Sequence, residues 1–232
     1  MIDIVIAIDG LSGCGKSTTA KELSKKLNYT YLDSGAMYRA VTLFFIKNNI
    51  DHSDSEEIQK ALKNINIEFK QDKKSTANET FLNGANVEQE IRNMEVSQGV
   101  SKISAIGEVR KVLVEQQRKL GAKKGVVMDG RDIGTVVFPD AELKIFMTAE
   151  LKERVRRRQK ELLERGENIT LDQISKNLEI RDRLDSSRKE NPLLPAKDSI
   201  EVDTTYMTFE EQVDQILKLA TAKISAVNKT IA

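Results

Sequence analysis

The chain has 232 residues, which suits one α/β domain with insertions or a core with a small lobe. It carries 37 basic and 36 acidic residues, so the net charge of +1 gives no sign of a polyanionic partner such as nucleic acid. One cysteine and one histidine exclude a disulfide framework, a histidine-activated nucleophile and a zinc site built from these residues. Asp3 and Asp9 interrupt the N-terminal apolar run, and no stretch reaches transmembrane length, so we expect a soluble cytoplasmic protein without a signal peptide.

The first motif is a phosphate-binding loop. Residues 10–17 match the P-loop pattern G-x-x-x-x-G-K-[ST] and stand between an apolar run and a helical stretch at 17–27. The glycines let main-chain N–H groups turn toward an anion, and the helix directs its positive end to the same place. Lys16 can reach the β- and γ-phosphates of ATP, and the Ser17 hydroxyl can bind Mg²⁺. The residues expected to bind ATP here are Gly10, Leu11, Ser12, Gly13, Cys14, Gly15, Lys16, Ser17 and Thr18.

Five short apolar runs alternate with helical stretches, which predicts a parallel sheet covered by helices on both faces. The predicted strands are residues 2–8, 29–32, 126–128, 143–147 and 200–202. Ligands of such sheets bind beyond the carboxyl ends of the strands. The following segments are therefore expected to meet there: 9–17, 33–39, 129–135 and 203–205.

Residues 64–90 interrupt this alternation. Residues 64–69 alternate like a strand, and residues 80–87 predict a hairpin that closes on Asn83-Gly84. We expect a small β-rich insertion here, polar and mobile between Gln71 and Glu79.

Three helices frame the remaining polar segments. One is expected from residue 34 to about Asn48, with Asp33 or Ser34 as its N-cap. The other two are residues 108–120 and an amphipathic stretch from Glu210 to about Ala226. Asp129 ends an apolar strand, which resembles the carboxylate on the magnesium side of P-loop enzymes.

Several charged groups leave two interpretations open. The arginines between Arg154 and Arg158 form either a solvated helix face or a ligand site, and Arg110 alone is more typical of a solvated face. Arg131 and Asp132 follow a strand and can form a salt bridge within their loop. The set Arg181, Asp185 and Arg188 is spaced four and three apart and shares one helix side.

Residues 9–18, 32–39, 129–139 and 181–188 together resemble the bacterial cytidylate kinases, within the nucleoside monophosphate kinase superfamily. This resemblance implies transfer of the γ-phosphoryl group of ATP to CMP or dCMP, with Mg²⁺. It also implies a five-stranded P-loop kinase core at 1–62 and 93–232, a short helical lid at about 151–170, and an NMP-binding insertion at 63–92. The chain departs from the family at Leu11, where proline is usual.

The resemblance also implies residue roles. For the base they are Ser101, Arg110 and Asp132, whose donors and acceptor suit the O2, N3 and N4 groups of cytosine. Near the ribose they are Ser34, Arg181 and Asp185, and at the acceptor phosphate Arg39, Arg131 and Arg188. Arg154, Arg157 and Arg158 are expected to approach ATP, and Ser17 and Asp129 to serve Mg²⁺, Asp129 through water. The groups expected to act in catalysis are Lys16, Arg131, Arg158 and Arg188.

Two alternatives remain open. One is a P-loop kinase with another acceptor, such as UMP, AMP or shikimate. The other is a nucleotide-dependent binding switch, although the chain lacks an Asn-Lys-x-Asp motif and carries many arginines suited to a second phosphate. We expect the nucleotides as partners of a monomer, and neither nucleic acid nor a membrane.

Overall fold

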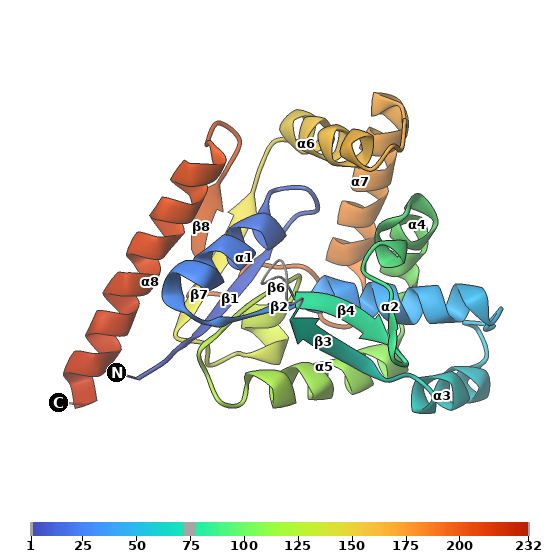
Figure 1. Ribbon diagram of the computed structural model, residues 1–232, viewed down its shortest axis with the longest axis horizontal. Coiled ribbons are helices and arrows are strands. Elements are labelled where there is room, and N and C mark those ends of the chain that lie inside the picture. Colours follow the sequence, from blue (N-terminus) through green and yellow to red (C-terminus); the bar gives the residue numbers. More distant parts are fainter. Residues whose placement is uncertain (1, 72–77, 232) are drawn as a thin grey trace. The chain divides into compact units, whose positions relative to one another are not determined.

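The computed structural model describes residues 2–71 and 78–231, which Figure 1 shows as a ribbon. The chain divides into two compact units, which are described one at a time. The first unit comprises Met1–Tyr31 and Gly121–Ala232, and the second is Leu32–Leu120.

A parallel sheet has the strand order β2-β6-β1-β7-β8, and all of it except Leu32 and Asp33 at the end of β2 belongs to the first unit. The strands are β1 (Val5–Gly10), β2 (Thr30–Asp33), β6 (Val126–Gly130), β7 (Leu143–Thr148) and β8 (Ile200–Asp203). All five predicted strands are confirmed, although β1 begins at Val5 rather than Ile2. The middle strands are buried almost throughout because their apolar residues are covered on both faces.

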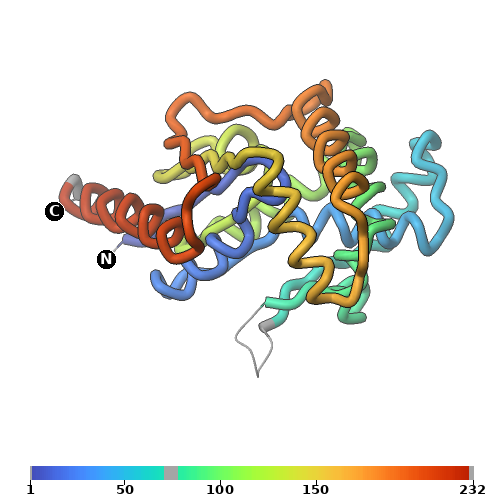
Figure 2. Tube along the Cα trace, turned by 90° about the horizontal axis from the view of Figure 1, so that it is seen from above, coloured from blue at the N-terminus to red at the C-terminus, as the bar shows by residue number. Residues whose placement is uncertain are grey.

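Helices of the first unit cover the sheet and extend past its strand ends. They are α1 (Lys16–Leu27), α6 (Leu151–Glu164), α7 (Leu171–Ser187), α8 (Phe209–Ile231) and a short π-helix, η2 (Ile133–Val137). Figures 1 and 2 show α8 beside α1, and α6 joined to α7 as a helical pair. The segment predicted as a lid, 151–170, comprises α6 and the turn that leads to α7.

The second unit combines helices with a three-stranded antiparallel sheet of order β3-β4-β5. The predicted hairpin is confirmed: β4 and β5 are joined at Asn83 and Gly84, whose φ angles of 50° and 82° suit a type I′ turn. The prediction of a mobile segment after Gln71 concerns residues 72–77, which lie outside the described residues. The elements are α2 (Ser34–Lys47), α3 (Ser55–Lys63), β3 (Ile67–Gln71), β4 (Asn78–Leu82), β5 (Ala85–Asn86), η1 (Glu90–Arg92), α4 (Met94–Ile103) and α5 (Gly107–Gly121).

Each unit has its own hydrophobic core. Ile6, Met147 and Ile216 are fully buried in the first, and Met37 and Leu113 in the second. The β-rich segment predicted at 63–92 thus lies inside a larger compact unit, because it shares a core with α2, α4 and α5. Within the described residues, none of the helices combines the length and apolar character that a membrane span requires.

Candidate active site

The P-loop connects the end of β1 to the start of α1. Strand β1 lies between β6 and β7, with Ile8 beside Asp129 and Gly10 beside Met147. A Cβ on Gly10, whose φ is 145°, would lie 2.0 Å from the Met147 carbonyl oxygen. Gly13 and Gly15 also have positive φ, so glycine is required for the path of the loop.

Lys16 begins α1 and folds back over the loop. Its Nζ donates to the Leu11 carbonyl oxygen at 2.5 Å and lies 3.6 Å from Cys14 Sγ. Burial lowers the pKa of Lys16, and the charge of Asp129 acts in the opposite direction. The carbonyl thus holds the ammonium group at the place where the loop would meet an anionic phosphate.

The P-loop is contacted by residues of α6 and α8 and by a residue that follows β8. Thr204, just after β8, donates from Oγ1 to the Cys14 carbonyl at 2.9 Å and is fully buried. Gln212 lies 2.8 Å from a Cβ added to Gly15 and accepts from Thr19 Oγ1 at 3.3 Å. The sequence placed residues 203–205 near the site. It gave neither Thr204 nor Gln212 a role, because polar residues after a strand carry no distinguishing signal.

The arginines of α6 reach the same loop. Arg154 is 5% exposed and donates to the Ser12 carbonyl at 3.1 Å and to Asp182 at 2.6 Å. Arg157 donates to the Cys14 carbonyl at 3.3 Å. The interpretation of a solvated helix face is therefore wrong for Arg154.

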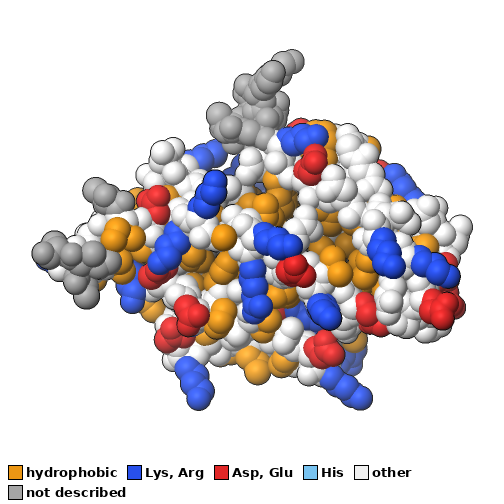
Figure 3. Space-filling model, turned by 90° about the horizontal axis from the view of Figure 1, so that it is seen from below, with side chains coloured by type: hydrophobic (Ala, Val, Ile, Leu, Met, Phe, Trp, Pro, Cys, Tyr) orange, Lys and Arg blue, Asp and Glu red, His pale blue; other side chains and the backbone are white. Residues whose placement is uncertain are grey.

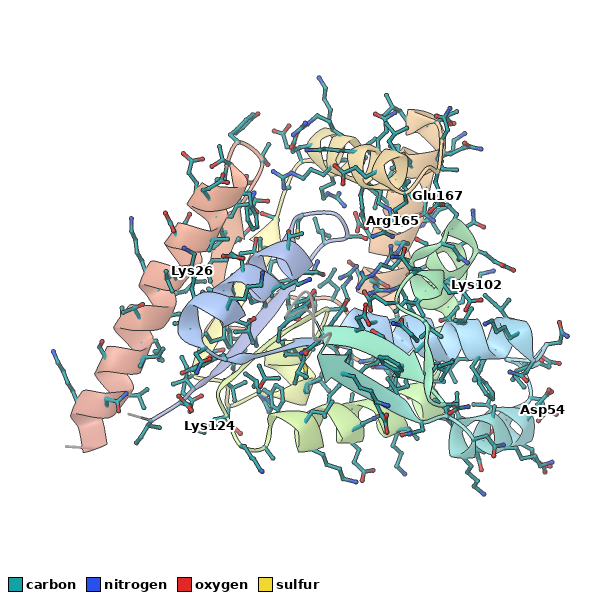
Figure 4. All side chains as sticks on the ribbon, viewed as in Figure 1. Lys26, Asp54, Lys102, Lys124, Arg165 and Glu167 are labelled. Atoms are coloured by element: carbon teal, nitrogen blue, oxygen red, sulfur yellow. The ribbon has the colours of Figure 1, made fainter. Side chains whose placement is uncertain are left out.

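Arg158 differs from its neighbours, because it forms an ion pair within its own helix, with Glu161 at 2.7 Å. Glu161 also pairs with Arg165, labelled in Figure 4 just past the end of α6.

Ser17 and Asp129 meet beside the P-loop. Ser17 Oγ donates to Asp129 Oδ2 at 2.8 Å, and Tyr31 donates to Asp129 Oδ1 at 2.8 Å. Hydroxyl and carboxylate oxygens are ligands that suit Mg²⁺ or its bound water. In the described part of the chain no cluster of three His, Cys, Asp or Glu residues could hold a metal alone, so a cation here would depend on nucleotide phosphates and water as well.

An ion-pair cluster follows β6. Arg131 Nε donates to Asp185 on α7 at 2.9 Å, and Arg188 lies 3.5 Å from Asp132. Burial acts to raise the pKa of Asp185, but Arg131 and Arg181 outweigh it and hold that pKa below its usual value. The sequence assigned five residues of this unit to the acceptor nucleotide, and the structure brings all five together.

Asp9 supports the turn that carries Asp132. Its carboxylate accepts from the main-chain N–H groups of Ile133 at 2.8 Å and Gly134 at 2.7 Å. Burial raises the pKa of Asp9 to about 7. Asp9 lies in the motif that the sequence singled out, yet its role depends on a contact across more than 100 positions that no local pattern reveals.

In the second unit, Asp33 organises the start of α2. It accepts from the Ala36 N–H at 2.8 Å as the predicted N-cap, and it pairs with Arg39 at 2.9 Å and Arg92 at 3.2 Å. Burial acts to raise the pKa of Asp33, but Arg39 and Arg92 lower it below its usual value. Arg92 was not predicted, because it lies far from Asp33 in the sequence.

Arg110 and Ser101 lie inside the second unit. Arg110 is 2% exposed, donates to the Ser104 carbonyl at 3.0 Å, and lies over the Tyr38 ring at 5.5 Å from its centroid. The interpretation of a solvated face is therefore wrong for Arg110. The Ser101 hydroxyl is buried and has no hydrogen-bond partner among the described residues, which marks it as a group that a ligand can satisfy. Ser34, the first residue of α2, is also buried.

A P-loop at the centre of a parallel sheet, with buried arginines beyond the strand ends, defines a phosphoryl-transfer enzyme of the P-loop class. More specifically, the chain belongs to the cytidylate kinase family, whose sequence model matches residues 6–222. It is an enzyme, a nucleotide kinase.

Relatives named cytidylate kinase cover nearly the whole chain. The protein from Cytophaga hutchinsonii is 56% identical over 224 residues, which are 97% of this chain and 96% of that protein. The protein from Bacteroides fragilis is 49% identical over 220 residues, 94% and 96% of the two chains. A solved structure of an uncharacterized protein from Eubacterium ventriosum shares the fold, with a TM-score of 0.51, 12% identity and coverage of 95% and 99%.

Proposed function

We propose that this protein transfers the γ-phosphoryl group of ATP to CMP or dCMP, forming ADP and CDP or dCDP. The observation that carries this is the ion-pair cluster of Arg131, Asp185, Asp132 and Arg188, whose two carboxylates are buried, in the same unit as the P-loop. A switch that binds one nucleotide needs no second arginine-rich phosphate site, whereas a kinase with a phosphate acceptor does.

The chemistry needs charge neutralisation more than a base. The second pKa of a phosphate monoester is near 6, so the acceptor oxygen is already a nucleophile at neutral pH. Bringing two anionic phosphates into line is the remaining obstacle, and Lys16 with the arginines reduces that repulsion. Arg131, Arg188 and Arg39 are proposed to hold the acceptor phosphate, because a guanidinium fork grips phosphate oxygens in two places.

Base selection is proposed to rest on Asp132, Arg110 and Ser101. A carboxylate accepts from the cytosine N4 amino group, and donors suit N3 and O2. Uracil reverses the pattern at positions 3 and 4, which leaves buried groups unpaired at about 1–3 kcal/mol each. Ser34, Arg181 and Asp185 are proposed to contact the ribose.

The donor side is proposed to comprise the P-loop with Arg154, Arg157 and Arg158, and α6 with its following turn to act as a lid that excludes water. Ser17 would bind Mg²⁺ directly, and Asp129 would bind it through water. The cation would neutralise charge at the ATP phosphates. The protein is proposed to act as a monomer with only nucleotides as partners. On the face that Figure 3 presents, basic and acidic side chains are interspersed, which gives no support to nucleic acid as a partner.

An acceptor panel tests the proposal. Initial rates with ATP are measured for CMP, dCMP, UMP, AMP and shikimate, and CMP or dCMP should be strongly preferred. Asp132→Ala should narrow the CMP-over-UMP ratio of kcat/KM at least tenfold, whereas Asp172→Ala, which removes an exposed carboxylate of α7, should not. A preference for another acceptor, or ADP release independent of added CMP, would refute the proposed reaction.

A further inference from the structure

Tyr31 is joined to the P-loop by hydrogen bonds that pass through Asp129. Its hydroxyl donates to Asp129 Oδ1 at 2.8 Å, and Ser17 Oγ donates to Asp129 Oδ2 at 2.8 Å. All three residues belong to the first unit. The carboxylate thus receives one O–H group on each oxygen, one from β2 and one from α1.

The Tyr31 hydroxyl is held in place by its ring. The ring is partly buried and packs against the hydrophobic core of the first unit. A tyrosine in this setting has an apolar body fixed by packing and a polar tip that needs a partner. Asp129 is 3% exposed, so the contact lies out of bulk water, where hydrogen bonds to a charged group are stronger.

The bond from Tyr31 has a consequence for Ser17. A serine hydroxyl has one proton and two lone pairs. When the proton is donated to Asp129 Oδ2, the lone pairs remain available to a cation, and their direction follows the orientation of the carboxylate. With Oδ1 held by Tyr31, the carboxylate plane is fixed from both sides.

We propose that Tyr31 is a positioning residue for the magnesium site. By holding Asp129 Oδ1 it directs Oδ2 to Ser17, and so aims the Ser17 oxygen at the cation that accompanies ATP. This inference rests on the proposed function, in which Ser17 and Asp129 serve that cation. Outer partners of metal-binding groups commonly change metal affinity ten- to a hundredfold, on the order of what is expected here.

The test measures binding of ADP, by calorimetry, once with Mg²⁺ and once with EDTA. The ratio of the two affinities is the magnesium enhancement. Tyr31→Phe should lower this enhancement about tenfold and leave the affinity for metal-free ADP unchanged. An unchanged enhancement, or an equal loss of both affinities, would overturn the role of Tyr31, because a purely structural defect would weaken ADP binding with and without the metal.

Tyr29→Phe is the matched control. Tyr29 also packs against the core of the first unit, but its hydroxyl accepts from the Ile4 N–H at 3.1 Å, away from Asp129. Its removal should leave the magnesium enhancement at the wild-type value. An equal loss of the magnesium enhancement in Tyr31→Phe and Tyr29→Phe would mean that the effect comes from packing, which contradicts the proposal.

Two further variants separate this inference from the proposed function. Ser17→Ala should abolish the enhancement; if it does not, the magnesium site itself is misplaced. If Ser17→Ala loses the enhancement and Tyr31→Phe keeps it, only the role of Tyr31 fails. In an Asp129→Asn background, Tyr31→Phe should have no further effect on the enhancement, and an additional tenfold loss there would contradict the proposed route through Asp129.

Discussion

At the scale of single residues, carboxylates and main-chain carbonyls hold the arginine and lysine side chains of the proposed site in place. Arg131 pairs with Asp185, Arg39 with Asp33, and Arg154 with Asp182. Lys16 instead donates to the Leu11 carbonyl. Such pairs keep buried charge compensated until an anionic ligand arrives, because an unpaired buried charge is costly.

Lys16→Met should reduce turnover at least a hundredfold, because the group that neutralises the transferred phosphoryl is lost. The fold should remain, since removal of a buried ammonium also removes its desolvation cost. Steady-state kinetics and circular dichroism measure the two effects. Lys26→Met, an exposed change later on α1 that Figure 4 labels, should alter neither. Near-normal turnover in Lys16→Met would refute its role.

Asp9 should make stability depend on pH. Its pKa of about 7 lies above the ordinary value of 3.8, so the folded protein binds this proton more tightly than the unfolded chain. Its contribution to stability is therefore present at low pH and lost as pH rises from about 4 to about 7, by at most about 4 kcal/mol.

Urea unfolding of wild type and Asp9→Asn across this pH range checks the prediction. The stability of wild type relative to Asp9→Asn should fall as pH rises and become constant above about pH 8. Asp172→Asn is the control and should follow the wild-type profile. A constant difference between wild type and Asp9→Asn would show that Asp9 does not titrate in this range.

At the scale of elements, the sequence predicted what local patterns encode. Apolar runs marked the strands, Asn83-Gly84 marked the hairpin, and Asp33 marked the start of α2. It did not predict η2, because its first N–H groups bond to Asp9 in a distant strand. Local spacing left the burial of Arg154 open and favoured a solvated face for Arg110, because helix periodicity does not show what packs against a side chain.

Gly10 and Gly84 offer a test of whether the path of the P-loop requires a residue without a side chain at position 10. Gly10→Ala places a Cβ 2.0 Å from the Met147 carbonyl, whereas Gly84→Ala, also at positive φ, meets nothing within 4 Å. Gly84→Ala should cost about 1 kcal/mol of unfolding free energy from backbone strain alone. Gly10→Ala should cost clearly more, about 3 kcal/mol or above, and should weaken ATP binding. Denaturant unfolding compares them, and equal costs would contradict the close approach of β1 and β7.

At the scale of the whole molecule, the chain divides into two compact units. The sequence predicted an insertion at 63–92, because the change to β-strands is visible there. The compact unit extends over Leu32–Leu120, since helices before and after the hairpin share its core. A shared core is a tertiary property that composition does not reveal.

Separate cores should give the units separate local stabilities. Leu113→Ala opens a cavity in the second unit and Ile216→Ala one in the first, and each should cost about 2–5 kcal/mol. Hydrogen exchange should rise mainly in the unit that carries the substitution. A uniform rise across the chain in both variants would show that the molecule opens as one cooperative whole.

A loop residue such as Leu11 can be ordered by either of two thermodynamic routes. The Leu11 N–H donates to the Met147 carbonyl at 3.3 Å, a bond that a proline at this position could not form. Proline restricts the unfolded chain, which is an entropic contribution, whereas this chain relies on an enthalpic one. This protein and its Leu11→Pro variant are therefore suited to comparison by calorimetry, since the heat and entropy of ordering the loop should differ even where the free energies agree.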